Sequence, residues 1–267
     1  MAIDTSLYAA ALPAGTYTKG DVISMGNIRG PAIVRDGYGK AILKRIICGT
    51  SNQASGANGI KGHVVIKNSN WMDEVANLVM SPTPVSLAEN SSNIQKGHDC
   101  DLFPNSGWEV KFIVDDTITT TAANDVYVLI DVDYPSVQAI RNPREEQGTP
   151  VTIMRDDTVT VTAFGSLPSA AWTTFNIDIL KAGYKYLLTE LGGFITSAGV
   201  AFVSISGAAG QNGLERIIPV IVNNLANMRY LLDYSTPLVK GPMNLNYLAI
   251  GTAGTGSAVI EMDWVRR

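Results

Sequence analysis

The sequence holds few of the residues from which metal sites and nucleophilic active sites are built. Its 267 residues include only two cysteines, Cys48 and Cys100, and only two histidines, His63 and His98. Two cysteines cannot build a dense disulfide framework, so we expect two free, buried thiols. The nucleophile elbow, the P-loop and the G-x-G-x-x-G fingerprint are all absent. The sequence therefore names no reaction, and we expect neither an enzyme nor a cofactor.

Charged residues are also scarce. Asp, Glu, Lys and Arg make up 16% of the chain, where about 25% is usual, and the formal net charge is −4. Nucleic-acid binding depends on positive charge, so this balance argues against direct sequence-specific binding of nucleic acid. The nearest basic patch lies in residues 29–45, and we interpret it as surface charge on strands: Arg29, Arg35, Lys40, Lys44 and Arg45. A low charge leaves more surface that tolerates being covered, which favours an assembled protein.

Long hydrophobic runs are missing too. No stretch approaches the roughly 18 consecutive apolar residues of a membrane span, so we expect no transmembrane segment. The first 15 residues, MAIDTSLYAAALPAG, lack the basic start of a signal peptide and carry Asp4. We therefore expect a protein made and used in a reducing cytoplasm, or packed into something assembled there.

The pattern that is present has a period of two, which is typical of half-buried antiparallel strands. In residues 108–116, WEVKFIVDD, four apolar residues fall on one face: Trp108, Val110, Phe112 and Val114. Glu109, Lys111 and Asp115 fall on the other face. Residues 126–134, VYVLIDVDY, place Asp131 and Asp133 opposite an apolar face. Helical spacing is rare, and we predict short helices only at 69–80 and around 222–232.

Three pairs of segments suggest that one domain occurs twice. Residues 126–135, VYVLIDVDYP, echo residues 257–266, SAVIEMDWVR, near the end of the chain. In the same order, 36–46 resembles 182–192, and 63–71 loosely resembles 201–209. Each member of the first pair would be the last strand of its half. The order of the matches predicts a duplicated β-rich domain whose loops differ in length.

We predict an all-β fold of two tandem jelly-roll-like β-sandwich domains with one or two short helices. The domains span residues 1–137 and 151–267, and residues 1–20 could form an extended arm. Residues 138–150, QAIRNPREEQGTP, are polar, hold two prolines and form the linker. An immunoglobulin-like sandwich is the competing interpretation, but the Cys-Trp-Cys spacing of that fold is missing.

The candidate metal and nucleophile residues are few. The segment GHDCD, residues 97–101, places His98 and Cys100 beside Asp99 and Asp101. Zinc needs three or four ligands, and Cys48 and His63 would complete a set only if the fold brought them near. A cysteine–histidine nucleophilic pair is conceivable on the same residues. A polar turn is the simpler interpretation, and we assign no metal site.

Oxygen-rich loops and aromatic residues give weaker hypotheses. Asp115, Asp116 and Asp125 bracket the hairpin-like segment TITTTAAN, and Asp156 and Asp157 precede another strand. Calcium favours such loops, but the dense D-x-D-x-D spacing is absent, so solvated turns are the expectation. The remaining candidates are Glu145 and Glu146 as a hydrolase pair and four tryptophans as a sugar groove: Trp71, Trp108, Trp172 and Trp264. We expect Trp108 and Trp264 to face the core, and we assign no catalytic residue.

A chain of this size with two jelly rolls, the second echoing the first, resembles the double jelly-roll capsid proteins of icosahedral bacteriophages. The segments RGPAIVRDGYG, 29–39, and STPLVKGPMNLNYLAIG, 235–251, are similar to virion proteins of tailed phages, including auxiliary head proteins that decorate the shell. The resemblance implies homotrimers in which two similar domains per subunit give a pseudo-hexagonal footprint.

The expected function is therefore that of a non-catalytic virion protein, made in the host cytoplasm, whose partners are its own copies and other virion proteins. Building the shell and decorating it both stay open as roles. A glycan- or receptor-binding module of a phage particle is the alternative, and an exposed aromatic cluster would favour it. A β-sandwich enzyme is a third class, against which the two distant histidines argue.

Overall fold

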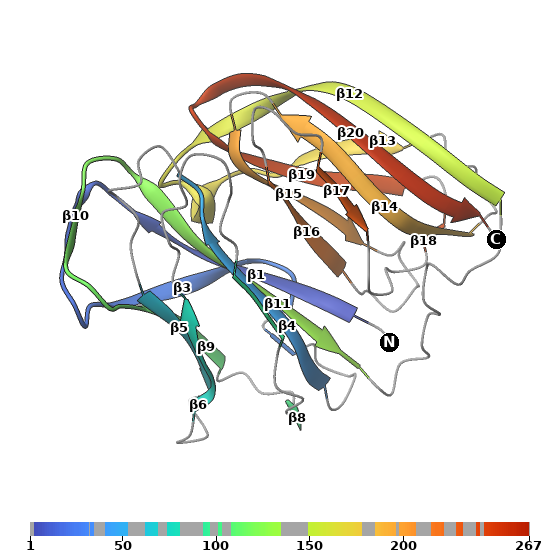
Figure 1. Cartoon of the computed structure of the whole chain (residues 1–267). Helices are drawn as coiled ribbons and strands as arrows, with labels where there is room; N and C mark the ends of the chain where they lie inside the picture. Colours follow the sequence, from blue (N-terminus) through green and yellow to red (C-terminus); the bar gives the residue numbers. More distant parts are fainter. Residues whose placement is uncertain are drawn as a thin grey trace. The chain divides into compact units, whose positions relative to one another are not determined.

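The structure is a computed structural model (Figure 1). It describes residues 3–31, 33–34, 41–52, 62–68, 74–80, 93–96, 101–102, 108–134, 149–177, 185–195, 198–206, 215–221, 228–231, 239–240 and 243–266.

Strands dominate the first half of the chain. They are β1 (Ile3–Leu12), β2 (Gly15–Tyr17), β3 (Val22–Arg29), β4 (Ala41–Thr50), β5 (Gly62–Asn68), β6 (Glu74–Met80), β7 (Asn93–Lys96), β8 (Asp101–Leu102), β9 (Trp108–Val114), β10 (Ile118–Thr120) and β11 (Asn124–Asp133).

Strands dominate the second half as well. They are β12 (Thr149–Ala163), β13 (Thr173–Ile177), β14 (Lys185–Ile195), β15 (Ala198–Ser206), β16 (Glu215–Ile221), β17 (Met228–Leu231), β18 (Val239–Lys240), β19 (Met243–Gly251) and β20 (Gly254–Arg266). The 3₁₀ turn η2 (Leu167–Ser169) follows β12. The predicted all-β fold is confirmed.

The first half forms one curled antiparallel sheet in the order β6-β5-β9-β3-β1-β11-β4-β7, with β8 beside β4. The curl occurs at β3, which belongs to two ladders. Its residues 22–25 pair with β9, whereas Gly26, Asn27 and Arg29 pair with β1 across a register shift. A strand that changes partners through such an irregularity makes a corner between two sheets. The resulting groups, β1-β11-β4-β7 and β3-β9-β5-β6, have the strand order of a jelly roll.

The second half repeats this order strand for strand. Its sheet runs β16-β15-β19-β12-β20-β14-β17, with β13 beside β19 and β18 beside β14. The groups β12-β20-β14-β17 and β13-β19-β15-β16 therefore correspond to the two groups of the first half. The corner differs, because β12 adjoins β19 directly.

The three predicted sequence echoes fall on equivalent strands. Residues 126–135 and 257–266 contain parts of β11 and β20, which occupy the same place in the two sheets. Strands β4 and β14 contain most of the second pair of segments, and β5 and β15 most of the third. The predicted duplication is confirmed, because all three matches link strands with the same neighbours.

Alternation of buried and exposed residues explains β9 but not β11. On β9, Val110, Phe112 and Val114 are buried while Glu109 is exposed, as the period of two predicts. On β11, every residue is buried, including Asp131 and Asp133. The expectation that β11 is half-buried is therefore wrong, since both faces of this central strand are covered.

The chain divides into two compact units that exchange short segments. The N-terminal unit holds Ser6–Val132 and Thr162–Ala170, and the C-terminal unit holds Met1–Thr5, Asp133–Val161 and Ala171–Arg267. Residues 138–148 of the predicted linker lie outside the described residues, and Thr149 and Pro150 already belong to β12. The predicted boundaries at 137 and 151 stay a prediction.

Two other predictions need correction. Residues 74–80 and 228–231 form the strands β6 and β17, so helices there are wrong; the rest of the predicted helical segments lies outside the described residues. Residues 3–12 are not an extended arm, because they form β1, a strand paired on both sides and buried at nine of ten positions. Small and apolar residues in this segment suit a crowded sheet centre, which explains the burial.

Candidate assembly surface

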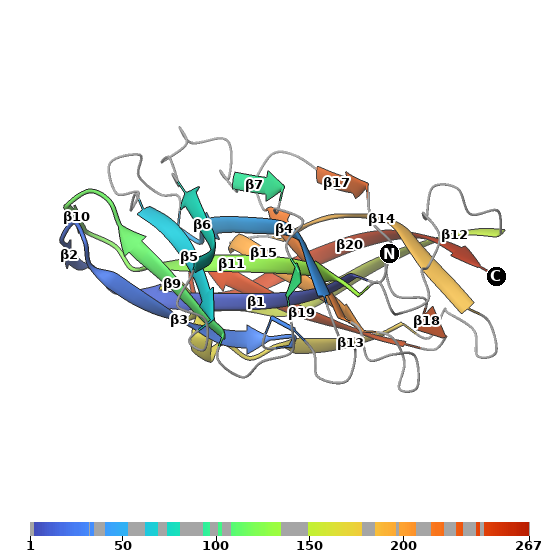
Figure 2. The same ribbon diagram turned by 90° about the horizontal axis from the view of Figure 1, so that it is seen from below.

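A two-stranded ribbon distinguishes the first jelly roll from the second. It pairs β2 with β10 in the register Tyr17↔Ile118, Thr16↔Thr119 and Gly15↔Thr120. The ribbon is inserted into the β1–β3 and β9–β11 connections, and Figure 2 shows it at the end where these four strands meet. The equivalent connections of the second half, 164–172 and 252–253, are fully described and contain no paired strands.

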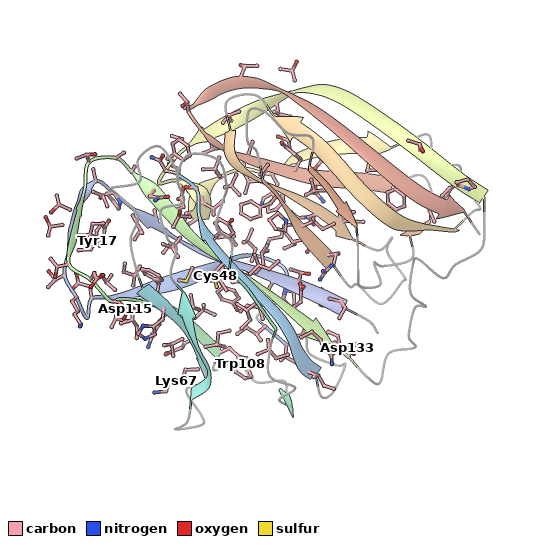
Figure 3. All side chains as sticks on the ribbon, in the orientation of Figure 1. Tyr17, Cys48, Lys67, Trp108, Asp115 and Asp133 are labelled. Carbon is pink, nitrogen blue, oxygen red and sulfur yellow. The ribbon has the colours of Figure 1, made fainter. Side chains whose placement is uncertain are left out.

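The ribbon is braced by its own polar groups. The hydroxyl groups of Thr16 and Thr119 share a hydrogen bond of 2.9 Å, and the Lys19 amide donates to Thr117 Oγ1 at 3.0 Å. The Tyr17 hydroxyl donates to the Pro13 carbonyl at 2.7 Å. Figure 3 shows Tyr17 on the ribbon. Such local bonds hold an exposed loop in one conformation, so little conformational entropy remains to be lost on binding.

The ribbon is anchored to the sheet by backbone bonds. The Gly20 amide donates to the Val114 carbonyl at 2.8 Å, and the Val114 amide donates to the Asp21 carbonyl at 3.0 Å. The Thr18 amide donates to Asp21 Oδ2 at 2.7 Å, which closes the turn between β2 and β3. The backbone hydrogen bonds of the sheet therefore continue into the base of the ribbon.

The surface of the ribbon is mostly neutral. Thr16, Thr18, Thr117 and Thr119 are exposed, and Tyr17 is half-buried, with its pKa raised by partial burial. Val22, at the start of β3, is 58% exposed and is the sole exposed large hydrophobic side chain in the described part of the chain. A rigid, exposed, weakly charged element with an apolar residue at its base is the kind of surface that suits burial in an interface.

Two pairs of polar side chains lie on β5 and β9 and on the residue that follows β9. His63 Nδ1 lies 2.9 Å from Asp115 Oδ1, and Lys111 Nζ lies 2.7 Å from Glu109 Oε2. The hydrogen bond and charge of Lys111, with a smaller effect of Lys67, lower the pKa of Glu109. Partly exposed pairs of this kind contribute little to stability, so we regard them as solubilising surface groups.

The predicted zinc or nucleophile set is not assembled in the described residues. Cys48 is a free thiol buried in the N-terminal unit, and burial strongly raises its pKa (Figure 3). His63 is paired with Asp115, while His98, Asp99 and Cys100 lie outside the described residues. No group of three or more His, Cys, Asp or Glu gathers anywhere in the part of the chain that the structure describes. Cys48 is the buried thiol that the sequence predicts.

The acidic residues predicted to lie in loops differ in their exposure to solvent. Asp116 is exposed, as expected for a turn residue, but Asp125 is fully buried. Its carboxylate accepts hydrogen bonds from Ser51 Oγ at 2.6 Å and from the amides of Gly165 and Leu167 at 2.9 Å. Asp125 is therefore an internal structural residue, and the prediction of a solvated turn is wrong for it. Asp156 and Asp157 lie on β12, and Glu145 and Glu146 lie outside the described residues.

The four tryptophans do not form a described aromatic surface. Trp264 on β20 is buried, as predicted, and Trp108 and Trp172 are half-buried. Trp71 lies outside the described residues.

The basic patch is partly described. Arg29 on β3 and Lys44 on β4 are half-buried strand residues, and Arg45 also lies on β4. Arg35 and Lys40 lie outside the described residues.

Sequence reasoning missed the ribbon as a unit. The hairpin-like character of TITTTAAN was visible, but its partner is residues 15–17, about a hundred positions earlier. The available signal was a pair of threonine-rich segments, TYT at 16–18 and TITT at 117–120, both next to strongly alternating strands. Strand pairing at this distance cannot be read from local pattern alone.

The sequence matches no known family model and no curated protein. Similarities to solved structures are distant. The VP2 subviral particle protein of infectious bursal disease virus matches 98% of this chain and 71% of its own, at 10% identity and a TM-score of 0.28. The PBSX exported protein XepA matches 96% of this chain and 86% of its own, at 10% identity and a TM-score of 0.27.

One half of the chain also resembles a pilus structure. A protein from Bacillus endospore appendages, described as disulfide-linked pili, matches 48% of this chain and 96% of its own, at 13% identity and a TM-score of 0.25. All three scores are too low to support a functional argument. Separately, within the described residues no helix is long and apolar enough to cross a membrane.

Proposed function

We propose that this protein is a non-catalytic structural component of a bacteriophage virion, which builds or decorates the icosahedral capsid through symmetric contacts between its copies. The observation that carries the proposal is the duplicated jelly roll, in which β12 to β20 repeat the strand order of the first half. Jelly rolls occur in viral capsid domains, and also in lectins and cupins, so the duplication rather than the fold alone is the decisive feature.

A duplicated domain suits a shell for a geometric reason. Soluble oligomers are mostly closed and symmetric, so equal subunits repeat the same contacts. Three copies of a chain with two similar jelly rolls present six similar blocks. We propose such a trimer as the building unit, with its own copies and other virion proteins as partners and the virion as its location.

The ribbon makes the two jelly rolls of each subunit different from one another. Because only the first jelly roll carries β2 and β10, similar blocks differ at one defined place. We propose that the ribbon and Val22 are buried between subunits. Burying a valine fully contributes about 1.5–3 kcal/mol, so covering the exposed part of Val22 would contribute about 1 kcal/mol per copy. The low charge of the chain, 16%, keeps the desolvation cost of such contacts small.

The test compares Val22→Asp with Thr160→Asp, which places the same charge on an exposed residue of β12 in the other unit. Each protein is purified and examined by light scattering and negative-stain microscopy. We expect wild type and Thr160→Asp to form closed oligomers or particles. The Val22→Asp oligomer should already dissociate at protein concentrations at least tenfold higher than those at which the wild-type oligomer dissociates. Particles would identify a shell-forming protein, and a trimer that stops there a decorating one. A monomeric wild type that binds glycans would refute the proposal in favour of a binding module.

A further inference from the structure

The N-terminal unit contains a buried carboxylate that binds a segment from the second half of the sequence. Asp125, at the start of β11, is completely buried. Its Oδ2 accepts hydrogen bonds from Ser51 Oγ at 2.6 Å and the Gly165 amide at 2.9 Å, and its Oδ1 accepts from the Leu167 amide at 2.9 Å. Gly165 has a φ of +80°, a conformation that favours glycine, and its amide donates to the carboxylate in this conformation. Segment 162–170 is thereby built into the N-terminal unit.

Asparagine side chains complete this network. Asn124 Oδ1 accepts hydrogen bonds from the Asn52 amide and from the Asp125 amide, both at 2.8 Å. Asn52 Nδ2 donates to the Ala123 carbonyl at 2.9 Å. These bonds hold the start of β11 against the residue that follows Ser51. The three groups that donate to the Asp125 carboxylate are neutral: Ser51, Gly165 and Leu167.

The C-terminal unit shows the reverse arrangement. It incorporates the first residues of the chain, which begin β1. Asp4 is fully buried, and its Oδ1 accepts a hydrogen bond from the Glu215 amide at 2.8 Å. Thr5 is also buried, and its Oγ1 accepts from Nη1 of the buried Arg216 at 3.1 Å. These contacts join residues 211 positions apart in the sequence.

We propose that the two halves of the chain are clasped by the exchange of two segments, 3–5 and 162–170, each of which completes a buried polar network in the unit formed mainly by the other half. A buried polar group that loses its partner carries a large desolvation penalty, so neither network is complete without the exchanged segment. The clasp makes each half depend on the other for folding. It is independent of whether the protein forms a shell.

The experiment cuts the full chain after it has folded. A protease site is inserted after residue 143, in the predicted linker, and the purified protein is cleaved. Both clasps then join the two fragments non-covalently, since Asp4 and Asp125 lie on one fragment and Glu215, Gly165 and Leu167 on the other. We expect the fragments to stay together at micromolar concentration in size exclusion. Fragments that separate at that concentration would overturn the proposal.

Variants test whether the clasps are responsible. Asp125→Ala and Asp4→Ala should each raise the dissociation constant of the fragments about 10- to 100-fold. The first removes the acceptor of the Gly165 and Leu167 amides, and the second removes the acceptor of the Glu215 amide. Asp116→Ala, the control, removes an exposed carboxylate and should change the dissociation constant less than twofold. Thr5→Val keeps the shape of the side chain but removes its hydroxyl, and it should raise the dissociation constant about three- to tenfold. This milder variant provides a test if an alanine variant does not fold. Equal values for all variants would contradict the clasp.

Hydrogen exchange on the uncut wild type gives a readout that needs no variant. The amides of Gly165 and Leu167 should exchange at least 100-fold more slowly than that of Lys19, whose acceptor, Thr117 Oγ1, lies on the exposed ribbon. Exchange at the same rate as Lys19 would show that segment 162–170 is not held, and the proposal would fail.

Discussion

The close approach of β4 and β11 makes Gly49 a sensitive position in the first jelly roll. Gly49 lies on β4, and the buried ring of Tyr127 on β11 packs over it. A Cβ at Gly49 would lie 2.6 Å from Tyr127 Cζ and 3.1 Å from Cε1, where ordinary contact begins at 3.4 Å. The ring cannot move outward, because Tyr127 is only 1% exposed. Gly49→Ala should therefore overpack the core.

The expected cost follows from this geometry. Overpacking one methyl group in a dense core costs about 1–3 kcal/mol. For a chain of this size, that lowers the melting temperature by about 2–12 °C. Thermal unfolding followed by circular dichroism, together with urea unfolding, measures the effect.

Two comparisons make the result specific. Gly15→Ala is the matched control, since nothing lies within 4 Å of a Cβ there, and we expect it to change stability by less than 1 kcal/mol. In a Tyr127→Ala background, the cost of Gly49→Ala should largely disappear, because the two residues are in contact. A Gly49→Ala protein that melts within 1 °C of wild type would refute the packing described for these strands.

Three further predictions concern other parts of the chain. Burial raises the pKa of Asp125, so this carboxyl stabilises the fold most below its unfolded pKa of about 3.8, and the contribution is lost as pH rises through the folded pKa. Urea unfolding should therefore show that Asp125→Asn costs more stability at pH 3.5 than at pH 7, and the opposite trend would contradict the burial effect. Cys48 should resist thiol reagents in the native protein and react on unfolding, and rapid native labelling would disprove its burial. Trp264→Ala should destabilise the protein by about 3–5 kcal/mol in denaturant unfolding, because the side chain is 1% exposed, and a change below 1 kcal/mol would contradict its place in the core.

The duplication could be predicted from sequence because equivalent strands face equivalent environments. Strands β11 and β20 share an order of apolar and acidic residues, and this order survives while the loops between strands change length. The helix predicted at 69–80 failed for a different reason. Val75, Leu78 and Val79 fit a helical face, but a short apolar run fits a strand equally well, and pairing with β5 decides the outcome.

The candidate site was less predictable because its pairings are distant in sequence. The ribbon joins residues about a hundred positions apart, and Asp125 finds its donors Gly165 and Leu167 some forty positions later. A local pattern reports which face of a strand is apolar, but it does not report which strand lies opposite. The sequence could therefore place Asp125 beside a strand, but it could not predict that the Asp125 side chain is buried.

The most direct test of the proposed function is the mass of the purified wild-type chain in solution, by native mass spectrometry across a wide concentration range. The proposal predicts a stable closed oligomer at three times the 28.5 kDa of the single chain, or larger particles built from that unit. A monomer of 28.5 kDa at every concentration would contradict a structural role that depends on contacts between copies.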